Sequence, residues 1–227
     1  MKKLLPTLTS ITIFSIAMAF LETAVVIYLR ELLYPGGFNF PLAPMPGKLV
    51  LTEILREFAT IIMLAGAGVL AGKTFSQRFA WFIYSFAIWD IFYYVFLKVF
   101  IEWPVSILDP DILFFIPLPW WGPVLAPIMI SLLMITAGAR SVMHEKNGVS
   151  VRTSLTRWAL LAAGILSLLY VFMADALKAL PASTQELGLL RPTQFNWPVF
   201  SIGYCLAVVA LWLMLNHHPI QSGKERM

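Results

Sequence analysis

Residues 8–33 read LTSITIFSIAMAFLETAVVIYLRELL, an apolar run long enough to cross a lipid bilayer. A helix rises about 1.5 Å per residue, so about 20 apolar residues cover the roughly 30 Å of hydrocarbon in a membrane. Five further stretches meet this criterion, and they lie at residues 49–71, 79–101, 121–139, 158–177 and 198–215. The sequence therefore predicts an all-α, polytopic integral membrane protein, with a six-transmembrane-helix bundle that forms one domain over residues 1–227.

The composition agrees with a protein that faces lipid. Of the 227 residues, 59% are hydrophobic and 12% are charged, and the mean hydropathy is +0.81. A soluble domain carries about 25% charged residues. We therefore expect the lipid bilayer to be the main partner of the chain. The formal net charge is +4, but its basic residues lie mainly in short loops, so nucleic acid is not expected as a partner.

The first apolar run resembles a secretory signal over part of its length. It follows Met1-Lys2-Lys3 and contains Ala17-Met18-Ala19, a small-residue pattern typical of a cleavage site. The run continues well past this point, through Val25 to Leu29. We therefore interpret it as a retained span rather than a cleaved signal.

Basic residues in the loops predict the orientation of the chain. If the N-terminus is cytoplasmic, ten Lys and Arg residues lie on the cytoplasmic side and four on the outer side. We therefore expect both termini in the cytoplasm and the protein in the cell membrane, which is the inner membrane in a bacterium. The ten are Lys2, Lys3, Lys73, Arg78, Arg140, Lys146, Arg152, Arg157, Lys224 and Arg226, and the four are Arg30, Lys48, Lys178 and Arg191.

The outer loops are predicted to contain short interfacial helices. The sequence Asp109-Pro110-Asp111 is typical of a helix start, with Asp109 as the N-cap and a proline at the first helical position. The apolar run 112–116 follows, before two prolines end it. Ser183 and Glu186 have the spacing of a capping box, which predicts a second short helix.

Charged residues lie inside the first three predicted spans, where each costs at least about 2.5–3.5 kcal/mol at the helix centre. In each of these spans an acid and a base share one helical face. With the predicted orientation, Glu22 and Asp90 lie near mid-membrane and the others in the outer half. The sequence thus predicts a polar pocket that opens to the outer side. Its candidate ligand-binding residues are Glu22, Arg30, Glu53, Arg56, Glu57, Asp90, Tyr94 and Lys98.

The alternative interpretation of these charges is a set of ion pairs that only fixes how the helices pack. The candidate residues are nearly balanced, with four acids and three bases. However, a buried ion pair often fails to recover in stability what its desolvation costs. A functional pocket is therefore the preferred interpretation.

Several classes of site lack the residues they need. All three histidines lie outside the spans, so haem would find no axial ligand there and no cofactor is expected. Ser/His and Cys/His catalysis would lack a base in the membrane. The intramembrane acids could suit a hard cation, but the three nearby bases argue against a metal site. The sequence also has no Walker A or dinucleotide-binding motif.

Three functional hypotheses remain. The leading one is a non-enzymatic membrane protein that binds or transports a small polar or charged solute from the outer side. The bases would hold the anionic part of the solute, and the acids would hold its cationic part or relay protons. A third hypothesis is a structural or assembly subunit of a larger membrane complex.

The second hypothesis is an intramembrane enzyme that acts on a lipid or an isoprenoid, with Glu22 or Asp90 as the general acid or base. The Trp89-Asp90 pair is similar to the aromatic–acid pair that small membrane-bound terpene cyclases carry inside a helix. This resemblance covers a few residues and implies a buried carboxyl group as proton donor. Fold alone does not decide among the three hypotheses.

Overall fold

The computed structural model describes residues 4–146, 154–182, 186–187 and 190–216. These residues form six helices that are long and apolar enough to cross a membrane, as expected of a multi-pass membrane protein, so the predicted number of spans is confirmed. The predicted span over residues 121–139 is wrong at its start, because Trp120–Pro123 forms a strand and the helix begins at Leu125. The helices are α1 (Leu4–Leu33), α2 (Gly47–Ala71), α3 (Phe75–Ile101), α4 (Leu125–Lys146), α5 (Leu155–Ala179) and α7 (Trp197–Leu215).

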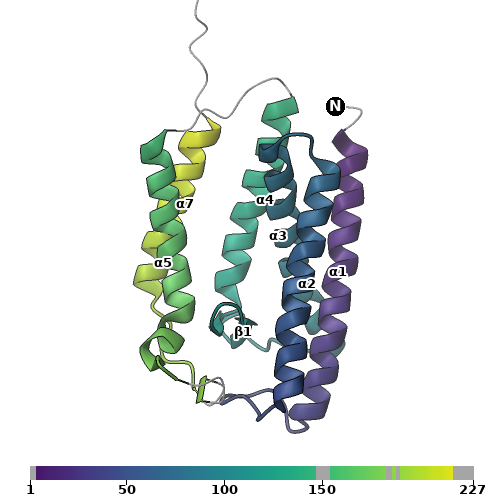
Figure 1. Ribbon diagram of the computed structural model, residues 1–227, viewed down its shortest axis with the longest axis vertical. Coiled ribbons are helices and arrows are strands. Elements are labelled where there is room, and N and C mark those ends of the chain that lie inside the picture. The colour runs from purple at the N-terminus through teal and green to yellow at the C-terminus, as the bar shows by residue number, and fades with distance from the viewer. Residues whose placement is uncertain (1–3, 147–153, 183–185, 188–189, 217–227) are drawn as a thin grey trace, which may run out of the picture.

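The six helices run along the long axis of the molecule (Figure 1). The start of α1 and the end of α7 lie at one end, which we call the terminal end. The connections α1–α2, α3–α4 and α5–α7 lie at the other, the hairpin end. Helix α3 packs against α1, α2 and α4, whereas α5 and α7 form a pair that joins the rest through α4 and a strand. Because α3 lies between α1, α2 and α4, it is the helix best placed to carry buried polar residues.

Glycines let the helices approach closely. A Cβ atom at Gly68 of α2 would lie 2.6 Å from the backbone oxygen of Arg78, and one at Gly164 of α5 would lie 2.8 Å from the backbone oxygen of Gly203 in α7. Small residues at contacts are the usual means of packing membrane helices, because lipid offers no hydrophobic driving force between them. These two seams therefore hold α2 against α3 and α5 against α7.

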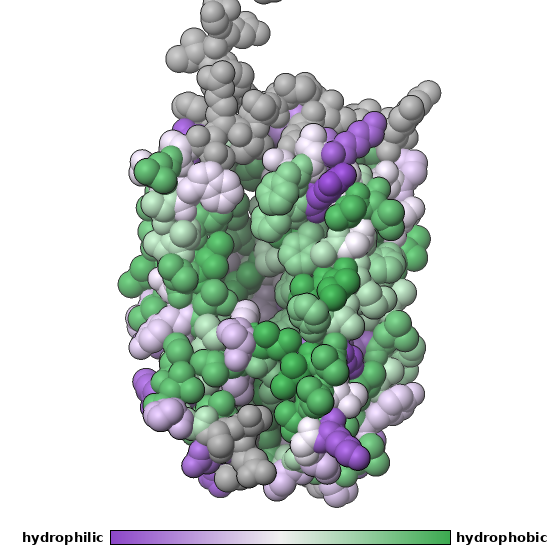
Figure 2. Space-filling view, in the orientation of Figure 1, coloured by the Kyte–Doolittle hydropathy of each residue, from purple (hydrophilic) through white to green (hydrophobic). Residues whose placement is uncertain are grey.

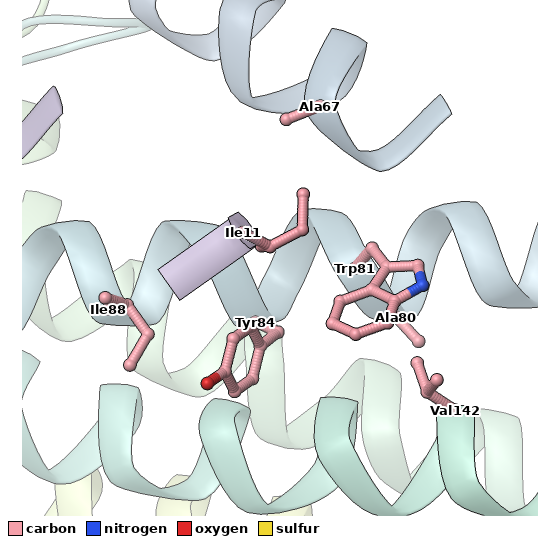
Figure 3. Packing of buried hydrophobic residues seen from close by; sticks show 7 residues of the cluster. All are labelled: Ile11, Ala67, Ala80, Trp81, Tyr84, Ile88 and Val142. Carbon is pink, nitrogen blue, oxygen red and sulfur yellow. The ribbon is translucent and has the colours of Figure 1, made fainter. Parts of the chain in front are cut away.

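The terminal half of the four-helix group α1–α4 is filled by apolar side chains (Figure 3). The hydroxyl groups of Thr12 and Tyr84 are 2.8 Å apart, so these polar atoms satisfy each other within the cluster. Side chains from all four helices meet there, which leaves the polar residues for the other half. The buried members are Ile11, Ala67, Ala80, Trp81, Tyr84, Ile88 and Val142.

A two-stranded antiparallel hairpin follows α3. Strand β1 (Pro110–Phe114) pairs with β2 (Trp120–Pro123), with Asp111 opposite Gly122. The helix predicted from Asp109 over the run 112–116 is therefore wrong. The second predicted helix, from Ser183 to Glu186, falls largely on residues 183–185, which lie outside the described residues.

The side chain of Asp109 explains the error. Its carboxylate accepts hydrogen bonds from the backbone N–H groups of Val105, at 2.8 Å, and Ser106, at 2.9 Å. Both donors precede Asp109, so the residue closes the turn after α3 instead of capping a helix that follows. An N-cap would accept from residues on its C-terminal side.

The hairpin inserts among the helices. The ring of Phe114 lies 6.0 Å from the rings of both Phe86 and Trp89 of α3. On the other side, Trp121 Nε1 donates a 3.0 Å hydrogen bond to Asp175 of α5. Non-helical backbone is tolerated at membrane depth only where protein surrounds it or a cavity solvates it. The hairpin is thus held between α3 and α5.

The molecular surface fits a bilayer. Hydrophobic residues cover the middle of the visible face, and most hydrophilic residues lie towards its two ends (Figure 2). Large apolar side chains are exposed on several helices, for example Leu70 at 91% and Leu166 at 65%. This surface is what a lipid-facing bundle requires.

Candidate functional site

A cavity of about 110 Å³ lies in the hairpin half, between α1, α2, α3, strand β1 and the α1–α2 loop. Its lining contains charged groups of both signs among aliphatic and aromatic side chains. The structure brings together seven of the eight residues that the sequence proposed for a pocket. They are Glu22 and Arg30 from α1, Glu53, Arg56 and Glu57 from α2, and Asp90 and Tyr94 from α3.

Lys98, the eighth candidate, does not line the cavity. Its ammonium group donates to the backbone oxygens of Glu102, at 3.1 Å, and Pro104, at 2.8 Å. Both acceptors lie just after α3, which ends at Ile101. A cation at this end also interacts favourably with the helix dipole. Although Lys98 shares a helical stripe with Asp90, the end of α3 draws its long side chain away from the cavity.

Arg56 holds two acids from different helices. Its guanidinium forms an ion pair with Glu22 of α1 and a second one with Glu53, at 2.8 Å, on its own helix. The side chain of Arg56 is 22% exposed, and that of Glu53 only 5%. Charges this far from water need partners, because removing one would leave the others buried and uncompensated. This cluster therefore ties α1 to α2.

Arg30 forms the second ion pair of the cavity. One of its nitrogens lies 3.2 Å from a carboxylate oxygen of Asp111 on β1. The guanidinium also lies over two rings, 3.9 Å from the centre of Trp103 and 4.3 Å from that of Phe38. Cation–π contacts of this kind stabilise a partly desolvated guanidinium. Arg30 thus connects α1 to the hairpin and to two loops.

Asp111 is a cavity residue that sequence reasoning missed as part of the site. Its side chain is 1% exposed, and burial raises its pKa to about 6, against the opposing effects of Arg30 and of the nearby Tyr93 and Tyr94 hydroxyls. The available signal was an acid directly before the apolar run 112–116. The predicted helix would have Asp111 in its first turn, and that position gives no reason to place the side chain beside α1.

Two other acids of the cavity have hydrogen-bond donors but no cation. Both carboxylate oxygens of Glu57 accept from the backbone N–H of Phe115, at 3.0 and 3.1 Å. Asp90 accepts a 2.8 Å hydrogen bond from the hydroxyl of Ser131 in α4. Within the described part of the chain, neither carboxylate forms an ion pair. These are the two carboxylates left for a further positive charge.

Several buried polar atoms along the cavity have no hydrogen-bond partner among the described residues. Two of them belong to neighbours in the ion-pair network: Arg30 Nη1, a donor, and Asp111 Oδ2, an acceptor. The others are the indole N–H of Trp89 and the hydroxyl of Tyr94. Buried polar groups without partners are rare in native proteins, and a bound molecule or water is a common reason. The cavity thus offers both donors and acceptors.

The α1–α2 loop forms the wall of the cavity nearest the hairpin end. The hydroxyl of Tyr34 accepts a 2.7 Å hydrogen bond from the backbone N–H of Ala43, which holds this loop together. Phe38, Leu42 and Met45 from the loop line the cavity. Burial raises the pKa of the Tyr34 phenol, so the hydroxyl stays protonated at neutral pH.

The acids of the cavity are not arranged as a cluster of metal ligands among the described residues. In the parts of the chain that the structure describes, no three His, Cys, Asp or Glu side chains converge to hold a metal ion. Two of the cavity carboxylates are instead bound to Arg56. The contacts that the structure shows for these acids are hydrogen bonds and ion pairs with arginine.

Comparison with known proteins gives no family: no protein-family model, curated protein or solved structure matches the chain.

Proposed function

We propose that this protein binds a small polar or charged solute in the cavity, which it receives from the outer side of the membrane, and that it serves as a binding or transport protein. The observation that carries the proposal is the cavity itself. It gathers charged residues from three helices and a strand, and unpartnered buried polar atoms line it. Ionisable groups inside a membrane are costly, and they usually mark a ligand or ion site.

The distribution of basic residues supports entry from outside. It predicts that the terminal end is cytoplasmic and that the hairpin end is outside. The cavity lies in the hairpin half, and the terminal half of the same helix group is filled by apolar side chains (Figure 3). A solute would reach the cavity from the hairpin end, and transport would require the terminal half to rearrange.

The size of the cavity supports a small solute. At about 110 Å³ it compares with the cavity of roughly 150 Å³ that holds benzene in an engineered protein core. Unlike that purely apolar cavity, this one has charged and polar groups among its apolar walls, so it can hold water. A ligand would therefore exchange with bound water rather than enter a dry space.

Cysteine labelling tests the proposed access. In a Cys205→Ala background, Val26→Cys places a thiol in the cavity lining of α1. Leu21→Cys is the matched control, because Leu21 is 61% exposed on the same helix and does not line the cavity. We expect a membrane-impermeant thiosulfonate applied outside to label Val26→Cys and not Leu21→Cys. Labelling of neither, or only from the cytoplasmic side, contradicts the proposal.

Binding is tested by a ligand panel that spans charge classes. We expect at least one of a small organic cation, an anion, a zwitterion and a neutral alcohol to raise the unfolding temperature of the purified protein. Val26→Phe fills the cavity without removing a charge, and it should abolish this rise. If no class stabilises the protein, or if Val26→Phe is stabilised equally, the cavity is not the binding site.

The enzyme hypothesis has one observation in its favour. Asp90 lines the cavity next to Trp89, and apolar side chains form much of the remaining wall. Glu22, the other candidate acid, is bound to Arg56 and is less available for proton transfer. Incubation with isoprenoid diphosphates and a neutral polyene, followed by mass spectrometry, tests this alternative. A product that depends on Asp90 would replace the binding proposal.

A further inference from the structure

We propose that the cavity takes a small organic monocation of the ammonium or guanidinium type, with Asp90 and Glu57 as its counter-charges. The inference rests on the proposed function and specifies its ligand class. It departs from the charge balance that the sequence suggested, because Lys98 is absent from the cavity and Asp111 is present.

The charges of the cavity carry the first step. Five carboxyl groups line it, against two guanidinium groups. Both guanidinium groups are already engaged: Arg56 binds Glu22 and Glu53, and Arg30 binds Asp111. Among the described residues, no cation forms an ion pair with Glu57 or Asp90, and Arg56 acts on Glu57 only from a longer distance. Burying a carboxylate without a positive partner is strongly unfavourable, so this lining favours an added cation over an anion.

The unpartnered atoms carry the second step independently. Asp111 is 1% exposed and Tyr94 is 4% exposed. Neither Asp111 Oδ2 nor the Tyr94 hydroxyl has a partner within hydrogen-bond distance among the described residues, although the two side chains are neighbours. Both line the cavity. An ammonium or guanidinium group supplies donors or positive charge for these oxygens. The two unpartnered donors, Arg30 Nη1 and Trp89 Nε1, suit a ligand oxygen or a water.

The walls favour an organic cation over a metal ion. In the described residues no three His, Cys, Asp or Glu side chains converge as they would in an all-protein Ca²⁺ site. Aromatic rings from Trp89, Tyr93 and Tyr94 line the cavity instead. Aromatic faces attract organic ammonium ions strongly when the contact is desolvated.

Protons offer the competing way to neutralise these acids. The charged or titratable groups around Asp90 and Glu57 are Arg56, Glu22 and Glu53 from α1 and α2, Tyr94 from α3 and Asp111 from β1, with Ser131 of α4 as the hydroxyl donor. If protons alone neutralise the acids, then no organic cation will bind measurably at neutral pH. That outcome overturns the inference.

The experiment compares three molecules of similar shape by calorimetric titration into the purified protein in mild detergent. Choline carries the positive charge and a hydroxyl. Its neutral isostere 3,3-dimethylbutan-1-ol lacks the charge. Glycine betaine keeps the ammonium group and has a carboxylate in place of the hydroxymethyl group. We expect choline to bind at least tenfold more tightly than either. Equal or tighter binding of the neutral alcohol or of the betaine overturns the inference.

Variants assign the binding to the two acids. Asp90→Asn and Glu57→Gln should each weaken choline binding about tenfold or more, which corresponds to about 1.4 kcal/mol. Glu31→Gln is the matched control, because it removes an exposed acid of α1 that does not line the cavity, and it should leave binding unchanged. Asp90→Glu retains the charge and should recover part of the affinity if Asp90→Asn folds poorly. Unchanged affinity in both neutral variants contradicts the assignment.

The two proposals can fail separately. If the betaine or an anion binds and Val26→Cys is labelled from outside, the cavity is a solute site and only the cation inference is wrong. If no member of the panel binds and Val26→Cys is labelled from neither side, the proposed function itself fails.

Discussion

At the scale of single residues, Arg56 organises the cavity. Its guanidinium is the only cation that the structure pairs with Glu22 and Glu53 in the described chain. Both acids lie deep in the helix bundle, where an unpaired charge has few waters to solvate it. The stability of the α1–α2 contact should therefore depend on this one side chain.

Removing the charge of Arg56 should destabilise the protein. We expect Arg56→Gln to lower the free energy of unfolding toward the lower end of the roughly 3–5 kcal/mol seen for broken buried pairs, since Arg56 keeps 22% exposure. Denaturant unfolding in detergent measures the change. The triple variant Arg56→Gln, Glu22→Gln, Glu53→Gln should recover most of the loss, because it leaves no buried charge unpaired. A single variant as stable as wild type would contradict this account.

Asp111 should make stability depend on pH. Burial raises its pKa from 3.8 to about 6, so the folded protein holds this proton more tightly than the unfolded chain. The contribution of protonated Asp111 to the free energy of unfolding is therefore complete below about pH 4, and it is lost as the pH rises through about 6. Each pKa unit corresponds to about 1.4 kcal/mol, which gives on the order of 2–3 kcal/mol.

The measurement is the difference in unfolding free energy between wild type and Asp111→Asn from pH 4 to pH 7. We expect wild type to lose stability relative to the variant over this range. The variant is the control for the wild type, because the other acids titrate in both proteins and cancel in the difference. A difference that is flat, or that rises with pH, would show that Arg30 outweighs burial in setting the ionisation of Asp111.

The sequence predicts most of the charged residues of the cavity, because helical spacing places Glu22 and Arg30, or Asp90 and Tyr94, on one face. It fails for Lys98, where the end of α3 offers backbone carbonyls that a long side chain can reach. It also fails for Asp111, whose position depends on a tertiary contact with Arg30. Spacing describes one helix at a time, and both errors arise from contacts between elements.

At the scale of elements, the hairpin is the largest departure from expectation. The run 112–116 is short and apolar, and periodicity alone cannot distinguish a strand from a buried helix at that length. Pairing with Trp120–Pro123 decides the outcome. The six long apolar segments carry no such ambiguity. A helix pairs all of its backbone N–H and C=O groups within one segment, as the interior of a bilayer requires.

The α2–α3 seam offers a matched test of close packing. A Cβ atom at Gly68 would meet the backbone oxygen of Arg78 at 2.6 Å, whereas one at Gly66 would meet nothing within 4 Å. We expect Gly68→Ala to destabilise the protein by about 1–3 kcal/mol, the usual range for overpacking. Gly66→Ala should be neutral or stabilising by up to about 1 kcal/mol, because alanine favours a helix.

Unfolding of the two variants in the same detergent gives the comparison. Equal effects of Gly68→Ala and Gly66→Ala would mean that α2 and α3 do not touch at this seam.

At the scale of the whole molecule, the two halves of the bundle differ in chemistry. The terminal half of α1–α4 is apolar, and the hairpin half contains the cavity (Figures 1 and 3). The positions of the basic residues predict that the terminal end is cytoplasmic. The orientation of the chain in the membrane rests on the sequence, so it requires its own experiment.

Two exposed serines at opposite ends test the orientation. With Cys205 replaced by alanine, Ser106→Cys lies in the α3–α4 connection at the hairpin end and Ser76→Cys in the first turn of α3 at the terminal end. We expect an impermeant maleimide to label Ser106→Cys in intact cells and Ser76→Cys only after permeabilisation. The reverse pattern would invert the orientation and place the cavity on the cytoplasmic side.

The most direct test of the central claim is the rate at which Val26→Cys reacts with an impermeant thiosulfonate applied from outside, with and without choline. We predict that the thiol reacts and that choline slows the reaction, whereas 3,3-dimethylbutan-1-ol does not. The slowing should disappear when Asp90→Asn and Glu57→Gln are added. A thiol that stays unreactive from outside, in the presence or absence of choline, would contradict a solute-binding cavity open to that side.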